Sequence, residues 1–175
     1  MFDPKALYIA TSKVYQNINP PVAIEGGCLY WAMAAMIAAR KLGLHEHGYE
    51  FQLQAGSASW IRLAPEDDDG KETTHNAFSY VFEDSAQTRM RILMDELPEM
   101  HCWVACAKTQ TIFDPTTKYL PRQCEKTGGM PWTAPKPSDF MLLKSGDTSD
   151  AMYTPSMEAT HLAYTYLNRF IESRK

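Results

Sequence analysis

A run from Cys28 to Ala39 contains no charged residue and ends in Arg40, Lys41 and Gly43, which are C-terminal helix signals. The sequence therefore predicts a helix of about 14 residues. Apolar side chains occupy all faces of this helix and many are alanines, which is typical of a helix buried at the centre of a domain. The run is far shorter than the ~20 apolar residues that span a membrane, so a membrane partner is not expected.

The composition fits one folded domain over residues 1–175, with 45% hydrophobic and 22% charged residues. Lys and Arg total 17 against 21 Asp and Glu, without a basic stripe, so nucleic acid is not an expected partner. The N-terminal residues lack the pattern of a signal peptide. The four cysteines form no Cys-x-x-Cys pair, which indicates reduced thiols and a cytoplasmic protein.

Helices and strands are both expected around the central helix. Asp3 and Pro4 open a predicted helix over residues 3–16, and Ser85 caps another that ends before Pro98. Thr154 and Pro155 are expected to open the last helix.

The strand signals divide the rest of the chain. Alternating residues predict strands over 49–54 and 58–63, joined as a hairpin by a turn at Gly56-Ser57, and further strands over 78–82, 101–107, 110–115 and 140–143. The proline-punctuated stretch 119–137 is expected to be a long surface excursion. The fold class is therefore α+β, with the Cys28 helix packed on an antiparallel sheet.

Cys28 follows Gly26-Gly27 at the start of the predicted central helix. Unpaired amides and the helix dipole stabilise a negative charge there, which favours the thiolate form of a cysteine. A thiolate is a nucleophile, so this position suits covalent catalysis. The alternative is a small apolar residue in a buried helix.

His101 and Asp114 belong to two predicted strands with Lys108-Thr109 at the centre of the connecting turn. With a two- or four-residue loop on this centre, residue i pairs with 217 − i, so Asp114 faces Trp103 and lies diagonally beside His101. A three-residue loop would put the two side chains on opposite faces. The expected register allows an acid to orient a histidine base.

Three motifs occur in order: Gly26-x-Cys28 with Ala32, His101-Cys-Trp-Val104 and Asp114-Pro-Thr116. Together they resemble the transglutaminase-like branch of the papain-like cysteine-protease fold. In that family a cysteine heads a central helix, and the histidine and aspartate lie on adjacent antiparallel strands. The resemblance implies that Cys28 is the nucleophile, His101 the general base and acid, and Asp114 the residue that orients the imidazole.

The oxyanion donor and the substrate cleft are less closely defined. Papain has a glutamine six residues before its cysteine, and here Val22 stands at that position. The amide of Cys28 is one candidate donor, with the side chain of Gln16 or Asn19 as a second. Candidates for the substrate cleft are Gly27, Trp103 and Trp132, with Trp60 as a further tryptophan that could line it.

Other residues have simpler interpretations. His75 also opens a strand and is the rival base, but no Asp-Pro-Thr follows on a paired strand. His45-Glu46-His47 lacks a third ligand at a recognisable spacing, so no metal site is expected. The acidic stretch 65–72 is expected to be a solvated loop. Cys102 and Cys106 are interpreted as packing residues, and His161 as a structural residue of the last helix.

The sequence thus predicts a cysteine hydrolase that acts on a peptide, isopeptide or amide bond, without a cofactor. Amine transfer of the transglutaminase type is the second hypothesis. A catalytically silent binding or structural domain with the same fold is the alternative from another class. The expected substrate is a peptide, an amide or a small acyl compound, and the sequence does not define which. It does not define the oligomeric state either.

Overall fold

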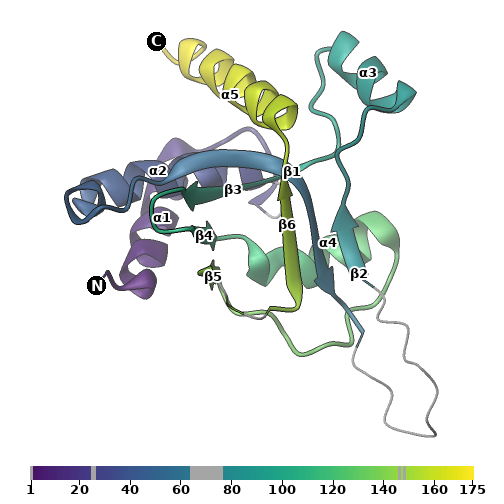
Figure 1. The fold of residues 1–175 in the computed structure, drawn as a ribbon. Helices are drawn as coiled ribbons and strands as arrows, with labels where there is room; N and C mark the ends of the chain where they lie inside the picture. The colour runs from purple at the N-terminus through teal and green to yellow at the C-terminus, as the bar shows by residue number, and fades with distance from the viewer. Residues whose placement is uncertain (1, 25–26, 64–76, 146, 148) are drawn as a thin grey trace, which may run out of the picture.

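The structure is a computed structural model that describes residues 2–24, 27–63, 77–145, 147 and 149–175. Helices and antiparallel strands alternate along it, which confirms the α+β class (Figure 1). The helices are α1 (Pro4–Ile18), α2 (Cys28–Lys41), α3 (Ala86–Leu93), α4 (Leu120–Gly128) and α5 (Met157–Glu172), with 3₁₀ turns at Leu44–His47 and Thr117–Tyr119. The strands are β1 (Gln52–Ile61), β2 (Ala77–Tyr80), β3 (His101–Cys106), β4 (Thr111–Asp114), β5 (Met141–Leu143) and β6 (Ala151–Pro155).

One antiparallel sheet organises the chain, with strand order β2-β1-β3-β4-β5 and with β6 paired to β1. Strand β1 is long and strongly curved, and it pairs with β2, β3 and β6 (Figure 1). Its first half pairs with β3, and its second half pairs with β2 and β6. A single strand therefore lies beside three others.

The expected hairpin turn at Gly56-Ser57 is wrong, because β1 continues through both residues. Gly56 pairs with His101 on β3 and with Pro155 on β6. A Cβ atom at this position would lie 2.2 Å from the backbone carbonyl oxygen of Thr154. The glycine therefore permits the close approach of β6 and does not mark a turn.

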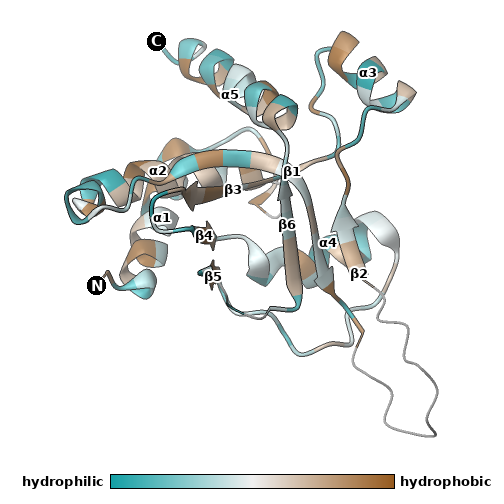
Figure 2. Cartoon of the chain, in the orientation of Figure 1, coloured by the Kyte–Doolittle hydropathy of each residue, from teal (hydrophilic) through white to brown (hydrophobic). Residues whose placement is uncertain are grey.

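The two N-terminal helices form as expected and contribute a large part of the core. The Asp3 carboxylate accepts a hydrogen bond from the Lys5 amide at 2.9 Å and caps α1, and Asn19 ends it in the left-handed conformation. Helix α2 packs against α1, β3, α5 and β1. Its alanines at positions 32, 34, 35 and 38 are fully buried, so small side chains allow this close packing. Apolar residues concentrate on α2 and β3 (Figure 2).

The second half of the chain contains two elements that the sequence analysis missed. The stretch 119–137 is not a surface excursion throughout, because it includes α4, whose Leu120 and Cys124 are buried. Thr154 and Pro155 belong to β6, and α5 begins at Met157, where the hydroxyl of Ser156 accepts the Ala159 amide. Proline at the last position of β6 ends a strand here and does not open a helix.

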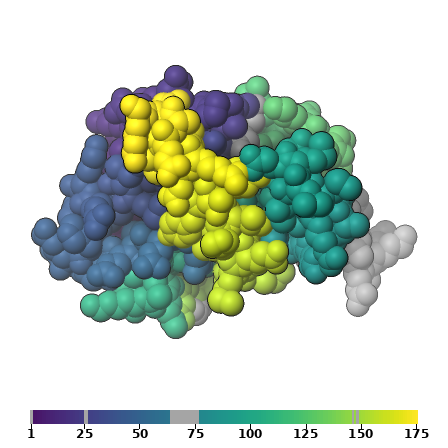
Figure 3. All heavy atoms as spheres, turned by 90° about the horizontal axis from the view of Figure 1, so that it is seen from above, coloured from purple at the N-terminus to yellow at the C-terminus, as the bar shows by residue number. Residues whose placement is uncertain are grey.

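Helix α3 has the expected cap, since the Ser85 hydroxyl accepts the Thr88 amide at 3.1 Å. The larger apolar side chains of this helix are not buried, since Met90 is 57% and Leu93 81% exposed. Seen from above, α5 crosses this face of the molecule and the α3 segment lies beside it (Figure 3). An ion pair between Arg169 and Asp95 connects the two. None of the helices in the described part of the chain is long and apolar enough to cross a membrane.

Candidate active site

The hairpin of β3 and β4 brings His101 and Asp114 together. Strand residues Val104, Ala105 and Cys106 pair with Phe113, Ile112 and Thr111, which is the expected register. The imidazole Nε2 of His101 lies 2.8 Å from Oδ2 of Asp114. Because both side chains are almost fully buried, at 2% and 0% exposure, water does not compete for this hydrogen bond.

Asp114 accepts hydrogen bonds on both carboxylate oxygens. Oδ1 accepts the backbone amide and the hydroxyl of Thr116 at 2.9 and 2.6 Å, and Oδ2 accepts the hydroxyl of Tyr153 at 2.7 Å. Burial tends to raise the pKa of Asp114, but the His101 charge and these hydrogen bonds lower it overall. The carboxylate is therefore held ionised and fixed in orientation. Tyr153 was not predicted as a site residue because it lies on β6, a strand that local sequence signals did not indicate.

Aromatic rings hold the imidazole of His101 on several sides. Tyr80 stacks on it at 5.4 Å between ring centroids, and Trp60 meets it edge-on at 5.0 Å. Trp103 and Tyr153 follow at 6.1 and 6.3 Å. This packing limits rotation of the ring and excludes water from it. The hydrogen bond to Asp114 then fixes Nε2 on the side of the carboxylate and Nδ1 on the opposite side.

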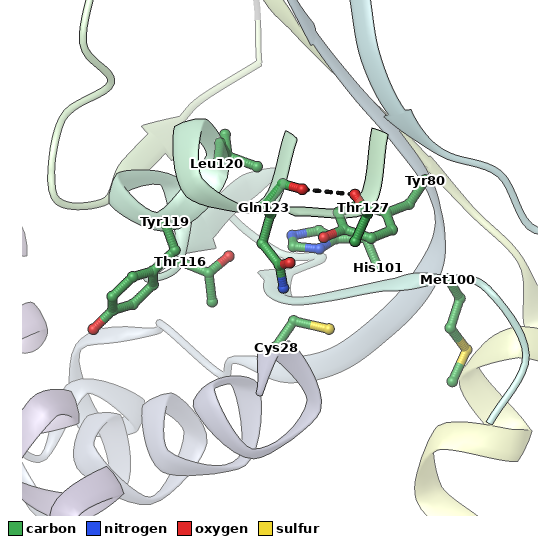
Figure 4. Close-up of a pocket in the computed structure, with 9 residues that line it drawn as sticks. All are labelled: Cys28, Tyr80, Met100, His101, Thr116, Tyr119, Leu120, Gln123 and Thr127. Carbon is green, nitrogen blue, oxygen red and sulfur yellow. Dashed lines mark hydrogen bonds between the residues drawn. The ribbon is translucent and has the colours of Figure 1, made fainter. Parts of the chain in front are cut away.

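Cys28 is the first residue of α2 and is half-buried, and no described side chain caps this helix start. It lines a cavity of about 140 Å³ together with His101 (Figure 4). Nδ1 of His101 is buried and has no hydrogen-bond partner among the described residues. A buried polar atom without a partner is uncommon, and this nitrogen belongs to a residue that lines the cavity with Cys28.

The thiol and the imidazole shift each other's titration. Interactions with the Cys102 thiol and with His101 lower the pKa of Cys28 well below its ordinary value, although burial acts in the opposite direction. Burial tends to lower the pKa of His101, but Asp114 and Cys28 raise it to about 10. The Cys102 pKa rises, since its thiol donates toward Cys28 and is buried. Near neutral pH the arrangement therefore favours a thiolate beside an imidazolium.

The roof of the cavity comes from the 3₁₀ turn Thr117–Tyr119 and from α4. Tyr119, Leu120, Gln123 and Thr127 line it, and the Gln123 side chain points toward Cys28 (Figure 4). The Thr127 hydroxyl donates to the backbone carbonyl of Gln123 at 2.6 Å. Gln123 was not predicted as a site residue because the prolines of the stretch 119–137 favoured a surface loop. Pro121 in the first turn and Gly128-Gly129 at the end were the signals of a short helix.

The two side chains expected to assist as oxyanion donors lie elsewhere. Gln16 is exposed near the end of α1, and Asn19 is exposed as its C-cap. Neither lines the cavity that contains Cys28. The proline pair after Asn19 separates α1 from α2, and this separation keeps both side chains away from the sulfur.

The three expected cleft residues also do not line this cavity. Gly27 is buried against the ring of Tyr15, where a Cβ atom would lie 2.4 Å from the phenol oxygen. Trp103 is fully buried and donates to the Gln54 side chain. Trp132 is half-buried in a cluster with Leu120 and Cys124. Burial of its large apolar surface in the core explains the placement of Trp103.

Among the described residues, the remaining candidates do not line the cavity. His75, Gly26 and the acidic stretch 65–72 lie outside the described residues. His45 and His47 are exposed, and within the described ranges no group of three or more His, Cys, Asp or Glu side chains is placed to hold a metal ion. Cys106 and Cys124 are buried and unpaired by disulfides, as is Cys102.

Comparison with known proteins adds no assignment: no protein family, no curated protein and no solved structure matches the chain. The fold and the site define an α+β chain with a buried cysteine–histidine–aspartate cluster at one end of a central helix. Any assignment of function therefore depends on the chemistry of this cluster.

Proposed function

We propose that the chain is a thiol-dependent acyl-transfer enzyme of the papain-like, transglutaminase-like class, and that it hydrolyses a peptide, isopeptide or amide bond. One observation carries the proposal. His101 is anchored through Nε2 to Asp114, while its buried Nδ1 has no partner among the described residues in a cavity that also contains Cys28. An anchored base beside a nucleophile is the arrangement that covalent catalysis requires.

The reaction follows from the charges at the site. The Cys28 thiolate attacks the carbonyl carbon and forms a carbon–sulfur bond, and the carbonyl oxygen becomes an oxyanion. As the carbon–nitrogen bond breaks, His101 gives its proton to the leaving amine. Water then attacks the thioester while His101 takes a proton from it. The carboxylic acid product leaves, and the thiolate and imidazolium are restored.

The backbone amide of Cys28 and the side-chain amide of Gln123 are suited to bind the oxyanion. The first lies at a helix start that no described side chain caps, and the second points toward Cys28 from α4 (Figure 4). Removal of one such donor costs ~10²-fold in kcat. Gln123→Ala is therefore expected to lower kcat by about that factor with little change in KM. Gln87→Ala, at an exposed glutamine of α3, is the control; equal activity of the two variants would remove Gln123 from the mechanism.

Alkylation by iodoacetamide between pH 5 and 9 tests the activated thiolate, with the modified cysteine identified by mass spectrometry. An ordinary thiol reacts about tenfold faster per pH unit in this range, whereas a thiolate already formed at pH 6 gives a nearly flat profile. We expect the flat profile for Cys28 and no modification at this position in Cys28→Ala. An ordinary profile at Cys28 would overturn the proposal.

Turnover then separates the functional classes. A panel of peptides, amides and esters, with and without an added primary amine, distinguishes hydrolysis from amine transfer by the mass of the product. A flat alkylation profile without an acyl-enzyme on any substrate would favour a silent binding domain of the same fold. A thiolate nucleophile needs reduction to remain active, which fits a cytoplasmic location.

A further inference from the structure

A second cavity, of about 580 Å³, adjoins the Cys28 cavity. The two share Tyr80, Met100 and Thr127 as lining residues, so these side chains border both the inner part at Cys28 and the outer part beside it. The outer part is bounded by β2, by the segment from Pro98 to Met100 and by the end of α4. We call this outer part the β2 groove.

The β2 groove is lined by Ala77, Phe78, Ser79 and Tyr80, which are four consecutive strand residues. Side chains of a strand alternate between its two faces, so a cavity lined by four residues in a row runs along the strand edge. β2 is the last strand in the order of the sheet, with β1 as its partner among the described residues. The edge that faces away from β1 therefore borders the groove.

The hydrogen bonds just after β2 show which backbone groups point outward. The amide of Phe82 donates to the Ser57 hydroxyl of β1 at 2.9 Å. The amide of Val81 donates at 3.1 Å to Glu99, a residue of the groove. Because successive backbone groups of a strand point to opposite edges, the N–H and C=O of Ser79 point the same way as those of Val81. Ser79 thus presents a donor and an acceptor to the groove.

We propose that the β2 groove binds an extended peptide, which pairs with the backbone of Ser79 and places its scissile carbonyl at Cys28. The inference rests on the proposed function and narrows its substrate from amides in general to a peptide chain in extended conformation. Strand addition at an exposed edge is a common way to bind peptides, since main-chain hydrogen bonds give affinity whatever the side chains.

The walls of the β2 groove indicate which side chains it accepts. Met100 and Met130 line it, and methionine adapts its shape to different apolar partners. Arg91 and Glu99 are exposed at the same groove and carry opposite charges. We therefore expect apolar residues to be preferred beside the scissile bond, with tolerance for either charge further out.

Labelling of Cys28 by epoxysuccinyl peptides tests the inference in the full chain. The probes carry one to four residues on each arm, with leucine or methionine next to the epoxide, and the rate is followed by intact mass. Loss of one backbone hydrogen bond corresponds to roughly 2- to 13-fold in rate. We expect the rate to rise at least about tenfold with arm length in the native protein, because added residues supply several such bonds.

Two Ser79 variants separate backbone pairing from side-chain effects. Ser79→Pro removes the outward N–H without touching the ladder to β1, and edge strands tolerate proline. Ser79→Pro should abolish most of the rise in labelling rate with arm length, whereas Ser79→Ala should retain this rise. N-methylation of each probe amide in turn provides the same test in the unmodified protein. Methylation of one particular amide should abolish the rise in labelling rate, as Ser79→Pro does.

The outcomes distinguish the two proposals. Iodoacetamide labelling of Cys28 reports on the activated thiolate alone and should be equal in all three proteins. Normal iodoacetamide labelling without a gain from longer arms, or with a gain that neither Ser79→Pro nor N-methylation reduces, would overturn the peptide groove and leave the proposed chemistry standing. Ordinary thiol behaviour toward iodoacetamide would overturn the proposed chemistry itself.

Discussion

Asp114→Asn should change how the free energy of unfolding of the protein depends on pH. The substitution keeps the size of the side chain and an oxygen for Thr116 but removes the charge next to His101. In the native protein the pKa of His101 is raised to about 10, above its ordinary value of 6.5. Proton binding to His101 therefore favours the folded state, fully below pH 6.5, and this contribution is lost as the pH rises toward 10.

The magnitude follows from the two values. The difference between about 10 and 6.5 corresponds to at most about 5 kcal/mol of unfolding free energy. Without the Asp114 charge, burial dominates and lowers the pKa of His101 below its ordinary value. The sign then reverses: the stability of Asp114→Asn should rise with pH up to about 6.5 and stay level above it.

Urea unfolding followed by far-ultraviolet circular dichroism at pH 6 to 9.5 measures both profiles. Cys28→Ala should be present in each protein, so that Cys28 does not titrate, and Asp139→Asn at an exposed position is the charge control. We expect the stability of the control to fall across this range relative to that of Asp114→Asn. Parallel profiles would refute the assignment of the raised His101 pKa to the carboxylate.

Two further substitutions test the surroundings of the cluster. Cys102→Ala should raise the pKa of Cys28, because it removes the thiol that interacts with the Cys28 sulfur, and the alkylation profile should move to higher pH; Cys106→Ala, on the same strand, should leave it in place. Gly56→Ala should cost about 1–3 kcal/mol in urea unfolding, because the new methyl group meets the backbone oxygen of Thr154. An unfolding free energy equal to that of the native protein within experimental error would show that β6 can move away from the new methyl group.

The sequence predicted the parts of the site that depend on local signals. The central helix followed from its charge-free run, and the His101–Asp114 contact followed from turn length and strand period. These signals lie within a few residues of the groups they place, so no knowledge of distant packing was needed.

The missed parts depend on contacts between distant segments. Tyr153 reaches Asp114 from 39 positions away, on a strand that pairs with the far half of β1. Gln123 enters the cavity on a helix whose Pro121 and terminal Gly128-Gly129 also fit a loop. Gly56 lies in a strand and not in a turn, and a larger residue there would collide with the backbone of β6. Long-range packing of this kind leaves little trace in local periodicity.

The ring packing around His101 gives the protein a built-in optical reporter. Trp60 and Trp103 contact the imidazole, and both are almost fully buried. A charged imidazole quenches the fluorescence of a neighbouring indole, so we expect the emission of these two side chains to follow the protonation of His101. Each proton transfer in the proposed reaction would then change the emission, and single turnovers could be followed without an added dye.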